Sequence, residues 1–302
     1  MQESAEGLIQ VIFLPAAGSY FYGTKNTHMK TIIVPTDFSP VSENAMWFAA
    51  DMAKHVDASL FLLHVYQLPV TVSEVPLVMI SADELKNDSD DLLKDLKEKI
   101  EQKTGGKLMV RTESRFGNIA GALEDVCDTT QPFAVVMGSQ GAGRMERIMF
   151  GSSVLTAIRR LHVPVMVIPP GVGYKPVRKI GLACDFRNVE ATLPQKDIKD
   201  IVRAFGAELH VLNVGDRLDH MAPSNKEQSG MLHLLLDELH PQYHYIHKEK
   251  IEESLDEFAQ RNNLDFLIVI PKKHAFPESL FHKSHSGQLA THAHVPVMAI
   301  HE

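Results

Sequence analysis

The stretch IIVPTDFSPVSENAMWFAADMAKHVDASLFLLHV, residues 32–65, contains two apolar runs on either side of a segment with helical spacing. Residues 31–35 and 60–65 are short and apolar, which is typical of strands. Between them, Ser39 followed by Pro40 indicates a helix N-cap with proline in the first turn. Apolar residues then recur at helical spacing, at Ala45, Phe48, Ala49, Met52, Ala53 and Val56. A helix between two fully apolar strands predicts a parallel sheet covered on both faces.

The alternation of strands and helices continues to about residue 170. A charged helix is expected over residues 82–103, with an apolar side formed by Leu85, Leu92, Leu93, Leu96 and Ile100. Further strands are predicted at residues 108–112, 134–137 and 163–168, and further helices over 119–129 and from about Gly151. The expected fold class is α/β, a doubly wound domain with a five-stranded parallel sheet. In such open sheets, ligands bind beyond the carboxyl ends of the strands, where the strand order reverses.

The chain also repeats itself. IIVPTDFSP (32–40) is echoed by GLACDFRNV (181–189), LFLLHVYQ (60–67) by LHVLNVGD (209–216), and HVPVMVI (162–168) by HVPVMAI (294–300). The first two repeats have the same offset and the third a shorter one, so two tandem copies of one domain are expected, the second with a shorter middle section. We expect one domain over residues 29–170 and another over 175–302, joined by the stiff, proline- and glycine-rich segment PPGVGYKP (169–176).

Composition limits the classes of function. A length of 302 residues suits two domains, and a net charge of −8 without a basic cluster counts against a nucleic-acid partner. Cys127 and Cys184 are too few and too far apart for a disulfide framework, so a reducing, cytoplasmic compartment is expected. The first residues, MQESAE, are acidic where an export signal carries positive charge, and Gln10 and Pro15 interrupt the apolar run that follows. We therefore expect residues 1–28 to be an extension outside the fold, not an export signal or a membrane anchor.

The stretch VVMGSQGAGRMERIMFGSS, residues 135–153, combines a strand, spaced glycines and a helix start. Gly138 ends the strand, Gly141 follows three residues on, and Gly151, Ser152 and Ser153 open the next helix. Small residues let backbone amides approach a ligand, and the N-terminus of a helix attracts phosphate. No lysine follows the glycines as in a P-loop. A plain turn with an N-cap is the structural alternative, but the complete spacing directly after a strand favours a nucleotide site.

These residues carry a family resemblance. The spacing Gly138-x2-Gly141-x9-Gly151-Ser152 resembles the nucleotide signature of the universal stress protein family. Residues 32–65 resemble the opening strand, helix and second strand of that family, and HVPVMVIP (162–169) resembles its closing strand. The likeness covers residues 29–170 and, more weakly, 175–302, so the whole chain resembles a tandem universal stress protein. It implies two domains of the adenine nucleotide alpha-hydrolase-like type, arranged as a pseudo-dimer.

The resemblance also implies roles in binding ATP, ADP or AMP. Asp37 would bind the ribose and adenine part, and Val65 would contact adenine through its backbone. The glycines and serines would hold the phosphates, together with Mg²⁺ or Mn²⁺. The complete set of implied nucleotide-binding residues is Pro35, Thr36, Asp37, Val65, Met137, Gly138, Gly141, Gly151, Ser152 and Ser153. Asp37 beside Ser39 is also suited to capping the helix, and the two roles are compatible.

The second copy departs from the pattern. Pro271 and His274 stand where Gly138 and Gly141 stand in the first copy, and Lys283 with Ser284 replaces Gly151 with Ser152. Proline has no N–H, and the other replacements bring Cβ atoms into the phosphate space. We therefore expect a degenerate domain that binds no ATP in the usual way. Family dimers pair their last strands, so residues 163–168 and 295–300 are expected to meet within the chain.

Histidines concentrate in the second copy. His240, His244 and His247 lie close together in one run, and a later run contains His282, His285, His292 and His294. Histidine is a common zinc ligand, but neither run has a cysteine partner or an H-E-x-x-H arrangement. Solvated or hydrogen-bonded histidines are the favoured interpretation, and zinc binding is the alternative.

The function expected from the sequence is a cytoplasmic stress-response sensor or regulator that binds adenine nucleotide in its first domain. No general base stands out near the glycines apart from Glu146, so at most slow ATP hydrolysis is expected. An ATP pyrophosphatase needs a Ser-Gly-Gly-x-Asp-type loop where this chain has PTDFSP. A pure interaction protein remains a further alternative. Pairing of whole chains into a homo-oligomer is expected, and the stress signal and partner proteins are not encoded in any motif.

Overall fold

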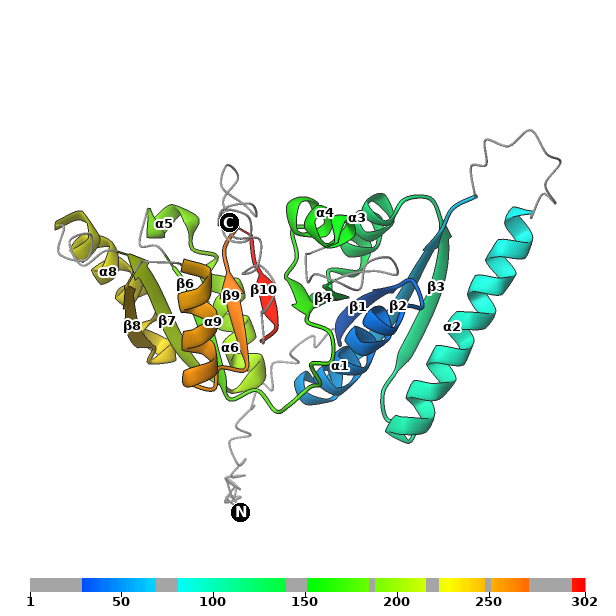
Figure 1. The fold of residues 1–302 in the computed structure, drawn as a ribbon, viewed down its shortest axis with the longest axis horizontal. Helices are drawn as coiled ribbons and strands as arrows, with labels where there is room; N and C mark the ends of the chain where they lie inside the picture. The colour runs from blue at the N-terminus through cyan, green and yellow to red at the C-terminus, as the bar shows by residue number, and fades with distance from the viewer. Residues whose placement is uncertain are drawn as a thin grey trace, which may run out of the picture.

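A computed structural model describes residues 29–68, 81–139, 151–184, 188–215, 223–247, 251–271 and 295–301. In this part of the chain, two α/β halves lie side by side and share one sheet (Figure 1). No described helix combines the length and the apolar character that a membrane span requires.

The first half contains five parallel strands in the order β3-β2-β1-β4-β5. The strands are β1 (Lys30–Thr36), β2 (Ala58–Tyr66), β3 (Val110–Phe116), β4 (Ala134–Gly138) and β5 (Val165–Ile168). The helices are α1 (Pro40–Val56), α2 (Ala82–Thr104), α3 (Ile119–Thr130) and α4 (Ser152–Arg160). The predicted elements of this half are all present, with ends that differ by a few residues.

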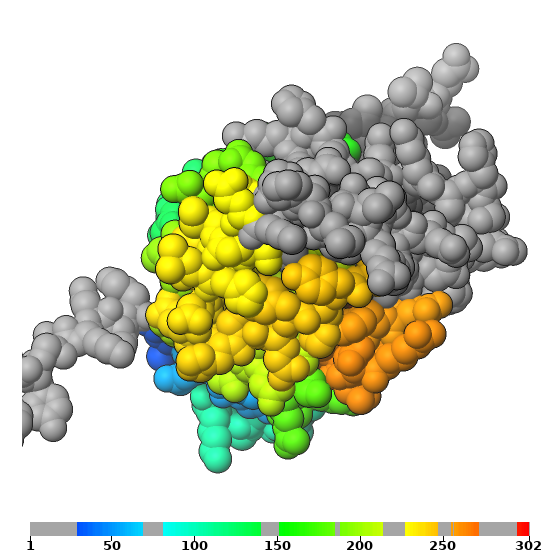
Figure 2. Space-filling view, turned by 90° about the vertical axis from the view of Figure 1, so that its left-hand side faces the viewer, coloured from blue at the N-terminus to red at the C-terminus, as the bar shows by residue number. Residues whose placement is uncertain are grey.

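The second half repeats this strand order in reverse, as β10-β9-β6-β7-β8. Its strands are β6 (Lys179–Ala183), β7 (Glu208–Gly215), β8 (Gln242–His247), β9 (Phe266–Val269) and β10 (Val297–Ala299). Its helices are α5 (Val189–Thr192), α6 (Gln195–Phe205), α8 (Pro223–Leu236), the short 3-10 helix η1 (Asp237–Leu239) and α9 (Ile251–Arg261). The end of the molecule formed by β8 and these helices is the face seen in Figure 2.

The closing strands of the two halves join the sheets. β10 pairs antiparallel with β5, with Met298 opposite Met166, while the other neighbouring strands pair in parallel. A single ten-stranded sheet results. The predicted fold class and the predicted contact between the last strands are therefore confirmed.

Helix α1 follows the sequence signals closely. Ser39 is the N-cap, its side chain accepts a hydrogen bond from the Ser42 amide, and Pro40 opens the helix. Asp57 ends it in the left-handed conformation. The six apolar positions predicted from spacing are all buried. The local signals agree with the packing here because α1 lies against four strands, β1, β4, β2 and β5.

Helix α2 agrees less well. A capping box between Ser81 and Glu84 starts it, and Leu93, Leu96 and Ile100 are buried as predicted. Leu92, expected on the same side, is instead 47% exposed. α2 packs on β2 and β3 at the edge of the sheet (Figure 1), so only a narrow stripe of the helix finds apolar partners.

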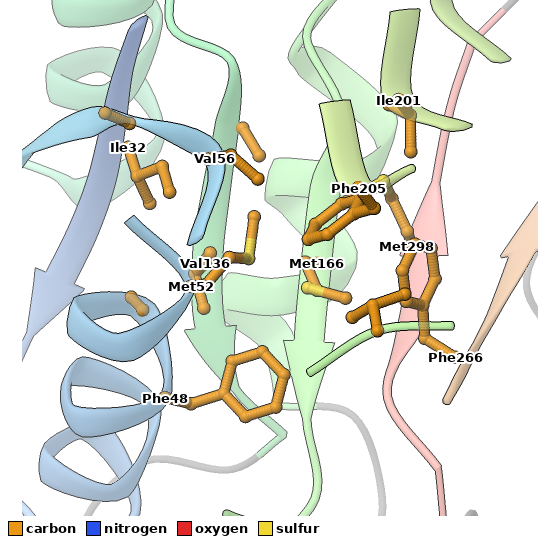
Figure 3. Packing of buried hydrophobic residues seen from close by; sticks show 14 of the residues in the cluster. Ile32, Phe48, Met52, Val56, Val136, Met166, Ile201, Phe205, Phe266 and Met298 are labelled. Atoms are coloured by element: carbon orange, nitrogen blue, oxygen red, sulfur yellow. The ribbon is translucent and has the colours of Figure 1, made fainter. Parts of the chain in front are cut away.

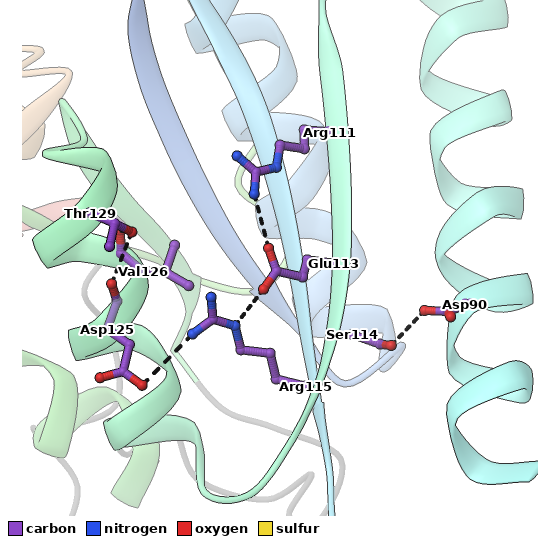
Figure 4. Close-up of polar contacts among 8 residues, drawn as sticks. All are labelled: Asp90, Arg111, Glu113, Ser114, Arg115, Asp125, Val126 and Thr129. Atoms are coloured by element: carbon purple, nitrogen blue, oxygen red, sulfur yellow. Dashed lines mark hydrogen bonds and ion pairs between the residues drawn. The ribbon is translucent and has the colours of Figure 1, made fainter. Parts of the chain in front are cut away.

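Strand β3 is the edge strand of the first half, and charged residues extend it beyond the predicted residues 108–112. On one face, Glu113 bridges Arg111 and Arg115 at 3.1 and 2.5 Å, and Arg115 reaches Asp125 of α3 at 3.8 Å (Figure 4). On the other face, the Ser114 hydroxyl donates a hydrogen bond to the Asp90 carboxylate of α2 at 2.5 Å. Charge along an edge strand discourages pairing with another chain, and it also explains why an apolar criterion missed half of this strand.

One hydrophobic core runs through both halves. Met166 of β5 and Met298 of β10 belong to this core, together with Phe48 of α1 from the first half and Phe205 and Phe266 from the second (Figure 3). The linker after β5 is also packed: the Asn44 side chain of α1 donates to its backbone carbonyls at two positions, 3.3 Å each. These hydrogen bonds hold the start of the linker against α1.

Candidate functional site

The sheet of the first half reverses its strand order at β1. β2 lies on one side of β1 and β4 on the other, with Ile33 opposite Val135. Asp37 directly follows β1, and Gly138 is the last residue of β4. The same edge receives the N-termini of α1 and α4, because each begins after the carboxyl end of a parallel strand. This is where open α/β sheets bind ligands.

Asp37 lies on the turn from β1 to α1 and is exposed. Its carboxylate accepts hydrogen bonds from the Ser39 amide at 3.1 Å and the Ser39 hydroxyl at 2.6 Å. Phe38, between them, has a φ of 60°, a conformation that costs energy for a residue with a side chain. Asp37 thus bonds to Ser39, and Ser39 itself is the N-cap of α1. The exposed position of Asp37 leaves room for a second role.

Pro35 and Thr36, the last two residues of β1, lie directly before this turn. Both are buried, and Thr36 is only 6% exposed. The Thr36 hydroxyl lies 3.1 Å from the Ser42 hydroxyl and accepts a hydrogen bond from the Phe38 amide. The side chain of Thr36 is thus directed to α1, and its contribution to the site is to hold the turn.

His64 is a site residue that the sequence reasoning missed. Its Nδ1 lies 2.7 Å from the carbonyl oxygen of Thr36, and its ring centroid is 4.5 Å from that of Phe38. It comes from β2, immediately before the half-buried Val65. The only sequence signal was a polar residue in an otherwise apolar strand, at the position next to the implied adenine contact.

Gly138 has a packing reason to be glycine. A Cβ atom there would lie 2.7 Å from both the carbonyl oxygen and the Cγ1 of Val41, in the first turn of α1. Met137 before it is 6% exposed and lies in the core. The glycine spacing predicted that the backbone at Gly138 approaches a ligand closely. The structure shows a close approach at Gly138, and the group that it approaches is Val41 of α1.

The start of α4 is tied to the end of β4. The amide of Gly151 donates to the Ser139 carbonyl at 2.8 Å, and the Ser139 amide donates to Ile168 of β5. Gly151 is the N-cap and, having no side chain, gives α4 no side-chain cap. Ser152 and Ser153 are exposed in the first turn. The amides of this turn have no partner within the helix, and together with the helix dipole they favour an anion.

Some predicted residues lie outside the described ranges. These are Gly141 and Glu146 in the first half, and His274, Lys283 and Ser284 in the second. The later histidine run lies outside as well. Pro271 is described and buried, two residues after β9. The structure therefore brings together β1, β2, β4 and α4 around the candidate site, while the degenerate motif of the second half stays a prediction.

The histidines of β7 and β8 form a pair that the sequence did not predict. His210 Nδ1 lies 3.0 Å from His244 Nε2, the rings are stacked within 12°, and Phe258 of α9 packs against His244. Burial lowers the pKa of both histidines. Within the described ranges, no group of three histidine, cysteine or acidic residues is placed to hold a metal. This pair fits the interpretation of hydrogen-bonded histidines.

Comparison with known proteins agrees with this geometry. The model of the universal stress protein family matches residues 28–169. A universal stress protein of Methanocaldococcus jannaschii is 32% identical over 142 residues, which are 46% of this chain and 81% of that protein. A universal stress protein of Archaeoglobus fulgidus has the same fold over 90% of this chain and 98% of its own, with a TM-score of 0.65 and 16% identity. A structure described as a putative universal stress protein from Pseudomonas aeruginosa gives 0.55 over 91% and 94%, with 13% identity. The chain belongs to the universal stress protein family.

Proposed function

We propose that the first half binds an adenine nucleotide at the carboxyl edge of β1 and β4. The observation that carries the proposal is the start of α4 beside the point of strand reversal. The N-cap there is a glycine, and the first-turn amides have no side-chain partner among the described residues. An exposed carboxylate, Asp37, follows β1 at the same edge. Groups complementary to an anion and to a sugar therefore lie at the same edge of the sheet.

The residues divide the ligand between them. The amides and hydroxyls of Ser152 and Ser153 would hold phosphate oxygens, because helix N-termini bind phosphate. The Asp37 carboxylate would accept hydrogen bonds from ribose hydroxyls. The backbone of Val65 would bind the base. A Mg²⁺ or Mn²⁺ ion would be held by the phosphates and a serine hydroxyl, and it would neutralise phosphate charge.

Binding is proposed to act as a switch in a cytoplasmic stress response. ATP, ADP and AMP all offer the adenine, the ribose and at least one phosphate that these groups address. The second half is proposed to serve as a permanent partner in place of a second chain, because β10 pairs with β5 as the closing strands of a dimer would. Association of whole chains into a homo-oligomer is part of the same proposal.

The experiment starts with the small molecules that the protein retains. Mass spectrometry of the material released by denaturing freshly purified protein is expected to detect an adenine nucleotide, and calorimetric titration is expected to give its affinity. A chain that retains no adenylate and does not bind added ATP, ADP or AMP would refute the proposal.

A negative charge added at the start of α4 separates binding from folding. Ser153→Asp places an acid in the first turn, where it interacts favourably with the helix dipole by about 0.3–1 kcal/mol. The melting temperature is therefore expected to stay the same or rise, while ATP binding weakens because two anions compete for the same amides. Ser153→Ala is the matched control, with a smaller loss of affinity. Equal ATP affinity in Ser153→Asp and the parent would place the phosphates elsewhere.

A further inference from the structure

Helix α4 lies over the junction of the two halves. Its buried residues Val154, Ala157 and Ile158 belong to a hydrophobic cluster that also contains Val297 and Ala299 of β10. In Figure 1, α4, in green, lies on the side of the first half that faces the red strand β10. The surface beneath the helix at the candidate nucleotide site is therefore supplied in part by the second half.

His301 continues this contact to the end of the helix. Side chains two residues apart on a strand point to the same side, so the face that carries Val297 and Ala299 leads to His301. His301 is part-buried, and its Nε2 donates a hydrogen bond to the carbonyl oxygen of Ile158. The last four carbonyls of a helix have no partner within it, and Ile158 is one of them. His301 thus caps α4 from the other half of the chain.

The hydrogen bond to Ile158 requires a proton on Nε2 of His301. Both the neutral ring with its proton on Nε2 and the positively charged ring carry that proton. Burial is the main cause that lowers the pKa of His301, and it favours the neutral ring. The Nδ1 atom has no hydrogen-bond partner among the described residues, which is consistent with a proton on Nε2. The cap is therefore present at neutral pH without a buried charge.

Helix α4 is consequently held at both ends. Gly151 ties its start to Ser139 of β4, and His301 ties its last turn to β10. The helix has nine residues, a rigid rod of about 13 Å. A rod of this length transmits a displacement of its last turn to its first turn, where the phosphate-binding amides are expected.

We propose that His301 is a positioning residue for the nucleotide site, through which the second half controls the affinity for phosphates. This inference rests on the proposed function. Because coupling between two sites is reciprocal, a nucleotide that binds the first turn of α4 also strengthens the contact with His301. Nucleotide binding in the first half then changes the contact of α4 with the second half.

Three substitutions test the proposal. His301→Leu removes the donor, His301→Gln keeps a side-chain N–H close to the position of Nε2, and His244→Leu disturbs a buried histidine of the second half away from α4. The readouts are the affinities for ATP and for adenosine, which has no phosphate, and the hydrogen exchange of residues 152–160 without nucleotide. Thermal unfolding checks that each variant is folded.

The expected result is specific to phosphate and to the donor. His301→Leu should bind ATP roughly fivefold more weakly, the size of one lost hydrogen bond, with unchanged adenosine affinity and faster exchange in α4. His301→Gln should restore the ATP affinity and the slow exchange of α4, and His244→Leu should leave both at the parent level. Parent-like ATP affinity in His301→Leu, no rescue by His301→Gln, or an equal effect of His244→Leu would overturn the inference.

Failure of the proposed function gives a different pattern. A parent protein that binds neither ATP nor adenosine refutes the nucleotide site, and the role of His301 at that site falls with it. The exchange of α4 still answers the structural question in that case: faster exchange in His301→Leu alone supports the cap, and unchanged exchange rejects it.

Discussion

The α-carbon of Gly138 faces the first turn of α1, at a distance that admits no side chain. A Cβ atom would lie 2.7 Å from the carbonyl oxygen of Val41, which is backbone and cannot rotate away. Glycine at this position is therefore required by the packing of β4 against α1. A large substitution at Gly138 would disturb folding before it reported on a ligand, so it is a poor probe of phosphate binding.

We expect Gly138→Ala to lower the free energy of unfolding by about 1–3 kcal/mol, as overpacking in a core does. Urea unfolding at neutral pH measures this change. Gly173→Ala in the linker is the control, because a Cβ there meets nothing within 4 Å, and its effect should stay within about 0.5 kcal/mol. Similar stability of the two variants would contradict the packing constraint at Gly138.

The turn after β1 shows which single-residue roles a sequence can predict. Ser39 and Pro40 act through neighbours a few residues away, so the N-cap and the first helical turn were predicted correctly. His64 acts on Thr36, which is 28 residues away, through the pairing of β2 with β1. Its role could not be predicted, because nothing local identifies its partner.

At the scale of elements, apolar periodicity predicted which segments form helices and strands. It predicted less well which of their residues are buried and where the strands end. Leu92 follows the apolar spacing of α2 but is exposed, since α2 covers only the last two strands of the sheet. The strand β3 extends further than its apolar part because an edge strand tolerates Glu113 and its neighbouring arginines. Both differences arise from position at the edge, where a strand or helix buries less of its surface.

Two histidines, which can each bind a proton, are in contact where β7 pairs with β8. His210 is 3% exposed and shares a hydrogen bond with His244, and burial lowers the pKa of each below the ordinary value of 6.5. The unfolded chain therefore binds more protons than the folded chain in acid, and stability rises with pH in that range. The contribution is complete above about pH 6.5 and is lost as the pH falls below that value.

We expect the free energy of unfolding to decrease between pH 7 and pH 5, as measured by urea unfolding in a series of buffers. His244→Gln removes one titrating ring and keeps a hydrogen-bonding group beside His210, so its decrease should be smaller. Glu208, 3.7 Å from His210 Nε2, opposes part of the effect. The same pH slope in His244→Gln and the parent would show that other groups cause the loss.

At the scale of the whole molecule, Phe205 connects the halves. The ring lies 6.3 Å from that of Phe133 in the first half, 5.7 Å from His55 of α1 and 5.5 Å from Phe266 of β9. It is 5% exposed and belongs to the core that contains Met166 and Met298. The two halves therefore share apolar contacts in addition to the hydrogen bonds between β5 and β10.

Phe205→Ala is expected to cost about 3–5 kcal/mol, because it leaves a cavity in a core common to both halves. Hydrogen exchange should accelerate in β1 as well as in β6, and unfolding should remain a single transition. Leu234→Ala, at a side chain that is 75% exposed on α8, should change stability by less than about 0.5 kcal/mol. Destabilisation confined to the second half would show that the halves unfold independently.

The pairing of the closing strands was inferred from the family resemblance. The alternation of strands and helices, the caps of α1 and the tandem repeat were predictable from the residues alone. These features depend on residues close together in the chain or on copies of the same pattern. Three contacts became known from the three-dimensional arrangement alone: Gly138 faces Val41, His64 bonds to the turn before Asp37, and His301 caps α4. Each of these contacts joins segments far apart in the chain, and which segments meet depends on strand order, on the register of the paired strands and on where each helix crosses the sheet.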